Sequence, residues 1–95
     1  MEKVLPLRRK IDEIDEKIIL FLKERVEVCK LIGKTKRNHG IPIRDYPRED
    51  EQYRHIMRRA SELGLNLHEV KAIYREIIAM CVHAQESDVT ESHSS

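Results

Sequence analysis

A single stretch of helical periodicity, over residues 5–38, takes up more than a third of this chain of 95 residues. Its apolar stripe, followed at steps of three and four residues, consists of Ile11, Ile18, Leu22, Cys29 and Ile32. No proline follows Pro6 within this stretch, and Gly40 with Pro42 provides its stop. At 1.5 Å per residue such a helix is about 50 Å long. The rest of the chain must therefore fold around a rod that is long for its size.

A loop over residues 40–46 separates this helix from a second, shorter one. Pro47 suits the first turn of a helix, where its missing N–H costs nothing, and Asp45 or Tyr46 is expected near the cap. Gly64 is expected to end this helix.

Asn66 and Glu69 form an N-x-x-E pair that resembles a capping box and opens a third helix. The apolar face of this helix consists of Val70, Ile73, Tyr74, Ile77, Ile78 and Cys81. Residues 86–95 are rich in Ser and Glu, which predicts a disordered tail. The sequence thus predicts an all-α fold, with one long and two shorter helices in a single domain over residues 1–85.

The long helix is expected to bury its stripe against a second copy of the chain. Two partner helices of about half its length cannot cover a rod of about 50 Å. A single three-helix core from so short a chain would also be thin. Because the two-fold dimer is the commonest closed assembly, we predict an intertwined helical homodimer.

Composition and spacing argue against several classes of function. The chain has 18 basic and 17 acidic residues, so no net field indicates nucleic acid or an anionic membrane as a partner. Its apolar runs are far shorter than the roughly 20 residues of a membrane span. Cys29 and Cys81 show no C-x-x-C spacing, which predicts free thiols and a cytoplasmic protein. No metal-ligand spacing, nucleophile motif or phosphate loop is present, so no metal or cofactor is predicted.

Arg25 is a charged residue on the apolar stripe of the long helix. Taken alone, it fits an internal salt bridge to an acidic residue such as Asp15 or Glu49, because buried arginine needs a partner. It also fits a guanidinium kept free to bind a ligand carboxylate. Lys36 lies three turns further on the same side, about 16 Å along the axis, where the two cations could bracket a small ligand.

Other polar residues are ambiguous from spacing alone. Arg8 lies roughly 26 Å from Arg25 along the same helix, so it is either a solvated first-turn residue or reaches the site of a partner chain. Gln85 is either the point at which the third helix meets water or a neutral donor at the mouth of a pocket. The cluster of Asp45, Arg48 and Glu49 is typical of a helix start.

Four motifs in order resemble those of the all-α chorismate mutases, and the match covers residues 5–85. Residues 7–15, LRRKIDEID, are similar to the opening L-R-x-x-I-D-x-I-D of that family. Residues 33–36, GKTK, resemble its G-x-x-K, and residues 42–49 resemble its P-I/V-x-D-x-x-R-E. Residues 77–85 resemble its I-I-x-x-S-x-x-x-Q, with Cys81 in place of the serine.

The resemblance implies an isomerase that rearranges chorismate to prephenate in phenylalanine and tyrosine biosynthesis, with no cofactor. It also implies two equivalent sites in an intertwined dimer, where Arg25 and the partner's Arg8 hold the two substrate carboxylates. Lys36 and Gln85 would donate to the ether oxygen, and Glu49 would accept from the ring hydroxyl. The resemblance further assigns substrate contacts to Asp45, Arg48 and Cys81. A thiol at Cys81 is a weaker donor than a hydroxyl, which predicts weaker substrate binding.

Three other functions stay open at this stage. An isochorismate-pyruvate lyase shares the fold and much of the pocket, although the full motif over residues 42–49 favours the mutase. A non-catalytic helical interaction subunit would keep the fold without the chemistry. A nucleic-acid binder would use the basic residues Lys34, Lys36, Arg37, Arg58 and Arg59, but the chain has no recognisable readout motif.

Overall fold

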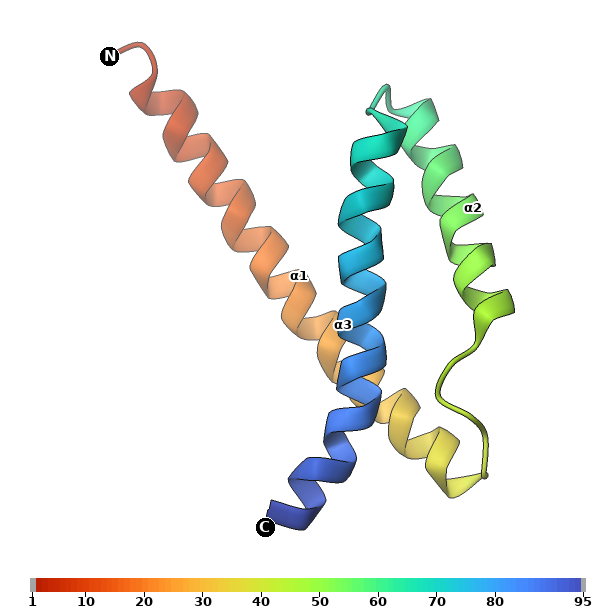
Figure 1. The fold of residues 1–95 in the computed structure, drawn as a ribbon. Coiled ribbons are helices and arrows are strands. Elements are labelled where there is room, and N and C mark those ends of the chain that lie inside the picture. The colour runs from red at the N-terminus through yellow and green to blue at the C-terminus, as the bar shows by residue number, and fades with distance from the viewer. Residues whose placement is uncertain (1, 95) are drawn as a thin grey trace.

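The computed structural model describes the backbone of residues 2–94 and the side chains of residues 2–86. It consists of α1 (Leu5–Asn38), α2 (Tyr46–Glu62) and α3 (Leu67–Ser94), and the described residues form no strand. Figure 1 shows α3 crossing α1, with α2 returning beside α3. The all-α prediction is confirmed. Because the side chains from residue 87 onward lie outside the described part, the predicted tail over residues 86–95 stays a prediction.

The starts of α2 and α3 follow from short polar side chains in the sequence. Asp45 caps α2 by accepting a hydrogen bond from the Arg48 backbone N–H at 3.1 Å. Asn66 caps α3 by accepting from the Glu69 backbone N–H at 2.9 Å. The two caps therefore fix the start of α2 and the start of α3.

Two glycines end the first two helices as predicted. Gly40 has a φ of 65° and Gly64 a φ of 72°, a region that glycine enters without steric cost. After Gly40, the Ile41 N–H donates to the Lys36 carbonyl at 2.8 Å, which satisfies a free carbonyl of the last turn of α1. The chain therefore turns sharply at the end of α1 and continues through a loop into α2.

The core of the single chain is small and lies where α3 packs on the other two helices. α3 contacts both α1 and α2, whereas the described parts of α1 and α2 do not pack on each other. The buried hydrophobic residues are Cys29, Ala60, Ile78, Val82 and Ala84. Gln85 is also buried, with 5% of its surface exposed.

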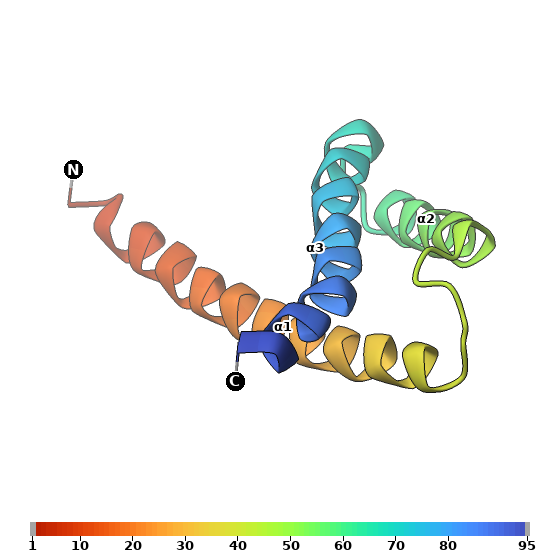
Figure 2. The same cartoon turned by 60° about the horizontal axis from the view of Figure 1, so that its bottom comes forward.

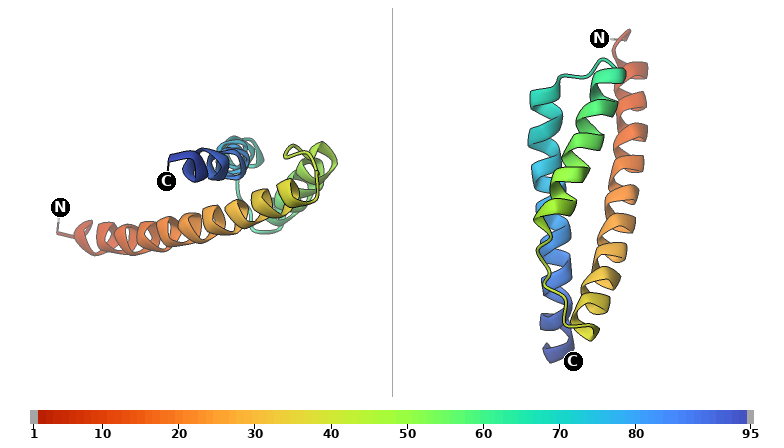
Figure 3. Two further views of the ribbon diagram at one scale, coloured as in Figure 1. Left: turned by 90° about the horizontal axis from the view of Figure 1, so that it is seen from below. Right: turned by 90° about the vertical axis from the view of Figure 1, so that its right-hand side faces the viewer.

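The single chain is extended rather than compact. Its radius of gyration is 17.0 Å, whereas a compact domain of this length has roughly 12 Å. Figures 2 and 3 show the N-terminal turns of α1 projecting away from α2 and α3. Every residue of α1 from Leu5 to Leu20 is exposed.

A disulfide joins Cys29 of α1 to Cys81 of α3. The prediction of two free thiols is therefore wrong for this structure. The residues are 52 positions apart in sequence, but the crossing of the two helices brings their Cα atoms to 5.3 Å, which is within the range that a disulfide spans. Spacing along the chain gives no sign of this contact.

Candidate functional site

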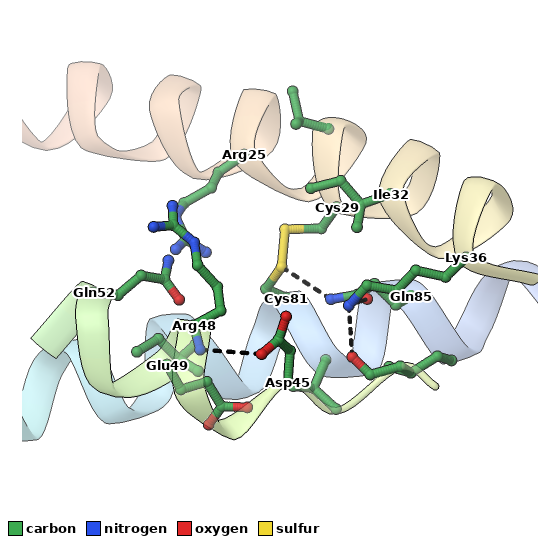
Figure 4. Close-up of a pocket in the computed structure, with 14 residues that line it drawn as sticks. Arg25, Cys29, Ile32, Lys36, Asp45, Arg48, Glu49, Gln52, Cys81 and Gln85 are labelled. Atoms are coloured by element: carbon green, nitrogen blue, oxygen red, sulfur yellow. Dashed lines mark hydrogen bonds between the residues drawn. A yellow bond between two sulfur atoms is a disulfide. The ribbon is translucent and has the colours of Figure 1, made fainter. Parts of the chain in front are cut away.

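A pocket of about 370 Å³ lies between the C-terminal half of α1, the start of α2 and the middle of α3 (Figure 4). Its polar lining comprises Arg25, Lys36, Asp45, Arg48, Glu49, Gln52 and Gln85. Its other lining residues are Val28, Cys29, Ile32, Ile43, Ile78, Cys81 and Val82. The structure thus brings together all the predicted site residues except Arg8.

Arg25 projects into one end of this pocket from α1. Its Nη1 donates to the carbonyl of Ile77 at 3.4 Å, and no carboxylate of the described residues lies within ion-pair distance of it. The alternative of a salt bridge to Asp15 or Glu49 is therefore wrong for this chain. A half-buried guanidinium without a carboxylate favours an anionic ligand.

Lys36 and Gln85 meet at the other end of the pocket (Figure 4). The Lys36 ammonium donates to the Ile43 carbonyl at 2.7 Å and to Gln85 Oε1 at 3.0 Å. Because an ammonium has three donors, one N–H remains for a ligand. The bond to Oε1 also orients the Gln85 amide, whose Nε2 faces Cys81 Sγ at 3.4 Å.

The α2 wall of the pocket carries its acidic residues. Glu49 is 16% exposed at its side chain and pairs with Arg44 at 2.8 Å. Arg48 pairs with Glu51 at the rim. The Asp45 carboxylate, which caps α2, lines the same wall. Because these charges are largely paired within α2 and its leading loop, the uncompensated positive charge of the pocket comes from α1.

The disulfide forms part of the pocket wall between the two cationic ends (Figure 4). A disulfide sulfur carries no proton, so Cys81 in this state cannot donate to a ligand. The Cys81 sulfur instead accepts weakly from Gln85. The predicted thiol contact at Cys81 is thus replaced by a contact that orients the amide.

Arg8 lies outside the pocket of its own chain. It is exposed on the first turns of α1, where the prediction had two readings. Its role as a residue that reaches a partner's site stays a prediction.

Gln52 is a lining residue that the sequence analysis missed. It lies near the Arg25 and Arg48 side chains in Figure 4. Its spacing of four residues from Arg48 and three from Glu49 puts it on their helix face, and this spacing was the available signal. Arg44, which holds Glu49, was likewise not identified.

The described residues lack two further features. They contain no group of three or more His, Cys, Asp or Glu side chains placed to hold a metal ion. They also contain no helix of the length and hydropathy that crossing a membrane requires.

Comparisons with known proteins agree with the motifs. Residues 7–86 match the family model of chorismate mutase type II. The chain is 39% identical over 85 residues to a bifunctional chorismate mutase/prephenate dehydratase of Aquifex aeolicus, which covers 86% of this chain and 24% of that protein. It is 40% identical over 62 residues to a chorismate mutase of Methanocaldococcus jannaschii, which covers 65% of this chain and 63% of that protein.

A solved structure has the same fold. It is that of a conserved hypothetical protein from Pyrococcus furiosus, which is 34% identical and superposes with a TM-score of 0.70. The alignment covers 90% of this chain and 97% of the other.

Proposed function

Because this chain belongs to the chorismate mutase type II family, we propose that it catalyses the rearrangement of chorismate to prephenate in phenylalanine and tyrosine biosynthesis. The ether C–O bond breaks while a C–C bond forms within the same molecule. No atom, proton or electron is exchanged with the protein, so the chain needs to supply only geometry and electrostatics.

The observation that carries this proposal is the pair of cations at the two ends of the pocket. Arg25 and Lys36 bond only to neutral carbonyl oxygens of the described residues, and no carboxylate there forms an ion pair with either. A dianionic substrate of small size fits such a pocket. The apolar lining between the cations matches a carbon ring.

Arg25 is proposed to bind one substrate carboxylate in bidentate fashion. Holding the carboxylate fixes the enolpyruvyl arm over the ring and removes rotational freedom before the bonds change. Glu49, held by Arg44, is proposed to accept from the ring hydroxyl, while Asp45 and Arg48 shape the same wall.

Lys36 and Gln85 are proposed to stabilise the transition state. Each keeps an N–H that bonds to no acceptor of the described residues, since the ammonium has three donors and the amide nitrogen two. The ether oxygen gains negative charge as its bond breaks, and fixed donors aimed at it favour the transition state over the substrate.

The partner's Arg8 is proposed to complete the site in an intertwined homodimer. The single chain leaves large hydrophobic residues exposed on the N-terminal half of α1, with Leu7 and Ile11 at 66% and 56%. An apolar face of this extent favours a second copy of the chain as its cover. A second substrate carboxylate then needs a further cation, because Lys36 is assigned to the ether oxygen and Arg48 is already paired with Glu51.

The direct test is the loss of chorismate absorbance with purified protein, together with identification of the product. We expect prephenate. Release of pyruvate from isochorismate with inert chorismate would instead assign the lyase reaction. Inertness toward both substrates would assign a non-catalytic subunit.

The shared site has its own test. Arg8→Ala and Arg25→Ala chains, each inactive alone, should regain activity when mixed, because one site of each mixed dimer keeps both arginines. Random exchange in a two-fold dimer gives at most about a quarter of wild-type activity. Absence of recovery after demonstrated subunit exchange would contradict the shared site.

A cytoplasmic location also stays a proposal, supported by the biosynthetic role. The disulfide removes the argument from free thiols, because disulfides persist mainly in oxidising compartments. Thiol labelling of the protein in fractionated cells measures both location and oxidation state.

A further inference from the structure

Gly33 of α1 lies directly against Gln85 of α3. A Cβ atom built at Gly33 would be 2.6 Å from the Cα, 2.7 Å from the carbonyl oxygen and 2.9 Å from the Cβ of Gln85. All three atoms belong to one residue, and two of them are backbone atoms that a side-chain rotation cannot move. The absence of a side chain at position 33 therefore sets how closely α3 approaches α1 at Gln85.

The other glycines of the chain have a different role. Gly40 and Gly64 have positive φ angles and no atom within 4 Å of a built Cβ, so they serve the backbone turns. Gly33 has no positive φ and lies buried within α1. Glycine is required at position 33 because a side chain there would clash with Gln85.

Two neighbours of Gly33 on the same side of α1 also bind Gln85. Arg37 Nη1 donates to the Gln85 carbonyl at 2.7 Å, and Lys36 Nζ donates to Gln85 Oε1 at 3.0 Å. Residues 33, 36 and 37 lie within about one helical turn. Gln85 itself is buried, so its backbone and its amide are both fixed from α1.

We propose that Gly33 and Arg37 are positioning residues, which act through Gln85 and set where its amide donor lies. The proposal rests on the proposed role of Gln85 as a donor to the substrate. Gly33 provides the close approach of the two helices. The hydrogen bond from Arg37 holds the Gln85 carbonyl against α1. The Gln85 Nε2 and the Lys36 ammonium can then donate toward the same point in the pocket.

The expected size of the effect follows from the distances. Bringing the Cβ of a Gly33→Ala variant from 2.6 Å to an ordinary contact of 3.4 Å moves Gln85 by about 0.8 Å. A misplacement on the order of 1 Å can cost about 10²-fold in rate. We therefore expect kcat to fall on the order of 10- to 100-fold, with only a few-fold change in KM, since Arg25 is untouched.

The test compares kcat, KM and thermal unfolding of Gly33→Ala with those of Gly64→Ala. The control variant strains a turn outside the pocket lining and should lose stability while keeping kcat. Gly33→Ala is then repeated in a Gln85→Ala background, which keeps the backbone clash and removes the amide. There we expect the loss of stability to persist and the further loss of kcat to vanish.

Each result has a clear consequence. An unchanged kcat for Gly33→Ala, or an equal fall of kcat with and without the Gln85 amide, overturns the positioning role. An unchanged kcat for Gln85→Ala alone overturns the donor role in the proposed function instead.

A second variant covers the case in which Gly33→Ala does not fold. Arg37→Ala removes the bond to the Gln85 carbonyl without a clash. It should lower kcat in a chain that keeps Gln85, and should lower it no further in the Gln85→Ala background. Arg37→Lys, which keeps a cationic donor, should recover part of that loss. Full activity of Arg37→Ala would contradict the assignment.

Discussion

The two halves of α1 have the same apolar periodicity but opposite environments. In the N-terminal half, Leu7 and Ile11 are mostly exposed. Figure 1 shows the N-terminal turns of α1 standing apart from α2 and α3. In the C-terminal half, Cys29 is 3% exposed and Gly33 is buried against α3. One half is thus packed within the chain, and the other has a hydrophobic surface that the described residues of α2 and α3 leave exposed.

This difference suits a helix that contributes residues to two pockets, one in its own chain and one in the proposed partner chain. The C-terminal half supplies Arg25 and Lys36 to the pocket of its own chain, whereas Arg8 on the N-terminal half lies outside that pocket. If the N-terminal half packs on a second copy, each chain contributes to two pockets. The predictions below test this division, beginning with the largest expected effect.

The largest effect is expected from removing an arginine in either half. Arg25→Ala and Arg8→Ala should each lower kcat/KM by about 10³-fold, because each leaves a substrate carboxylate without its cation. Steady-state kinetics measure this loss, and circular dichroism should show unchanged helix content. Arg9→Ala, beside Arg8 in sequence but off its stripe, is the matched control and should keep normal kinetics. Equal activity of Arg8→Ala and Arg9→Ala would place the N-terminal half outside the site.

The next largest effect concerns the exposed surface of the N-terminal half. Ile18 is 50% exposed in the single chain. Ile18→Asp should dissociate the dimer and abolish activity at low protein concentration, because a dimer interface would bury the new charge. Sedimentation measures the dissociation, and assays over a range of protein concentrations measure the loss of activity. Glu16→Asp places the same side chain on the opposite face and should leave the dimer intact. A fully active monomer of Ile18→Asp would contradict the composite site.

A smaller and pH-dependent effect is expected in the C-terminal half. An amide donates at any ordinary pH, whereas a carboxyl donates only when it is protonated. Gln85→Glu should therefore be about 10²-fold slower at neutral pH and recover as the pH falls toward the usual carboxyl range of roughly 4–5. The pH profile of kcat measures this recovery. A flat profile for the variant would contradict the donor role.

Reduction of the disulfide is expected to have the smallest effect on turnover. It should, however, clearly lower stability. The disulfide closes a long loop between α1 and α3, and loop-closure entropy predicts that it stabilises by up to about 4 kcal/mol. Reductant should lower the Tm by up to about 30 °C, as measured by thermal unfolding monitored by circular dichroism. The Cys29→Ala/Cys81→Ala double variant should not respond to reductant. The same Tm for reduced and oxidised wild-type protein would contradict a structural role for the bond.

The sequence by itself determined the helices and most of the polar residues that line the pocket. Asp45 and Asn66 predicted where α2 and α3 begin, and Gly40 and Gly64 predicted where α1 and α2 end, because caps and left-handed turns depend on residues close in sequence. Motif resemblance identified polar pocket residues from all three helices but not Gln52, and every predicted site residue except Arg8 lines the pocket.

Only the tertiary structure decided how the helices cross, and hence which residues meet. Three contacts arise at this crossing: the disulfide of Cys29 with Cys81, the close approach of Gly33 to Gln85, and the hydrogen bond from Arg25 to the Ile77 carbonyl. The partners are about 50 residues apart in the chain. Local propensity carries no information about such contacts, because they depend on the angle and register at which two separately formed helices pack.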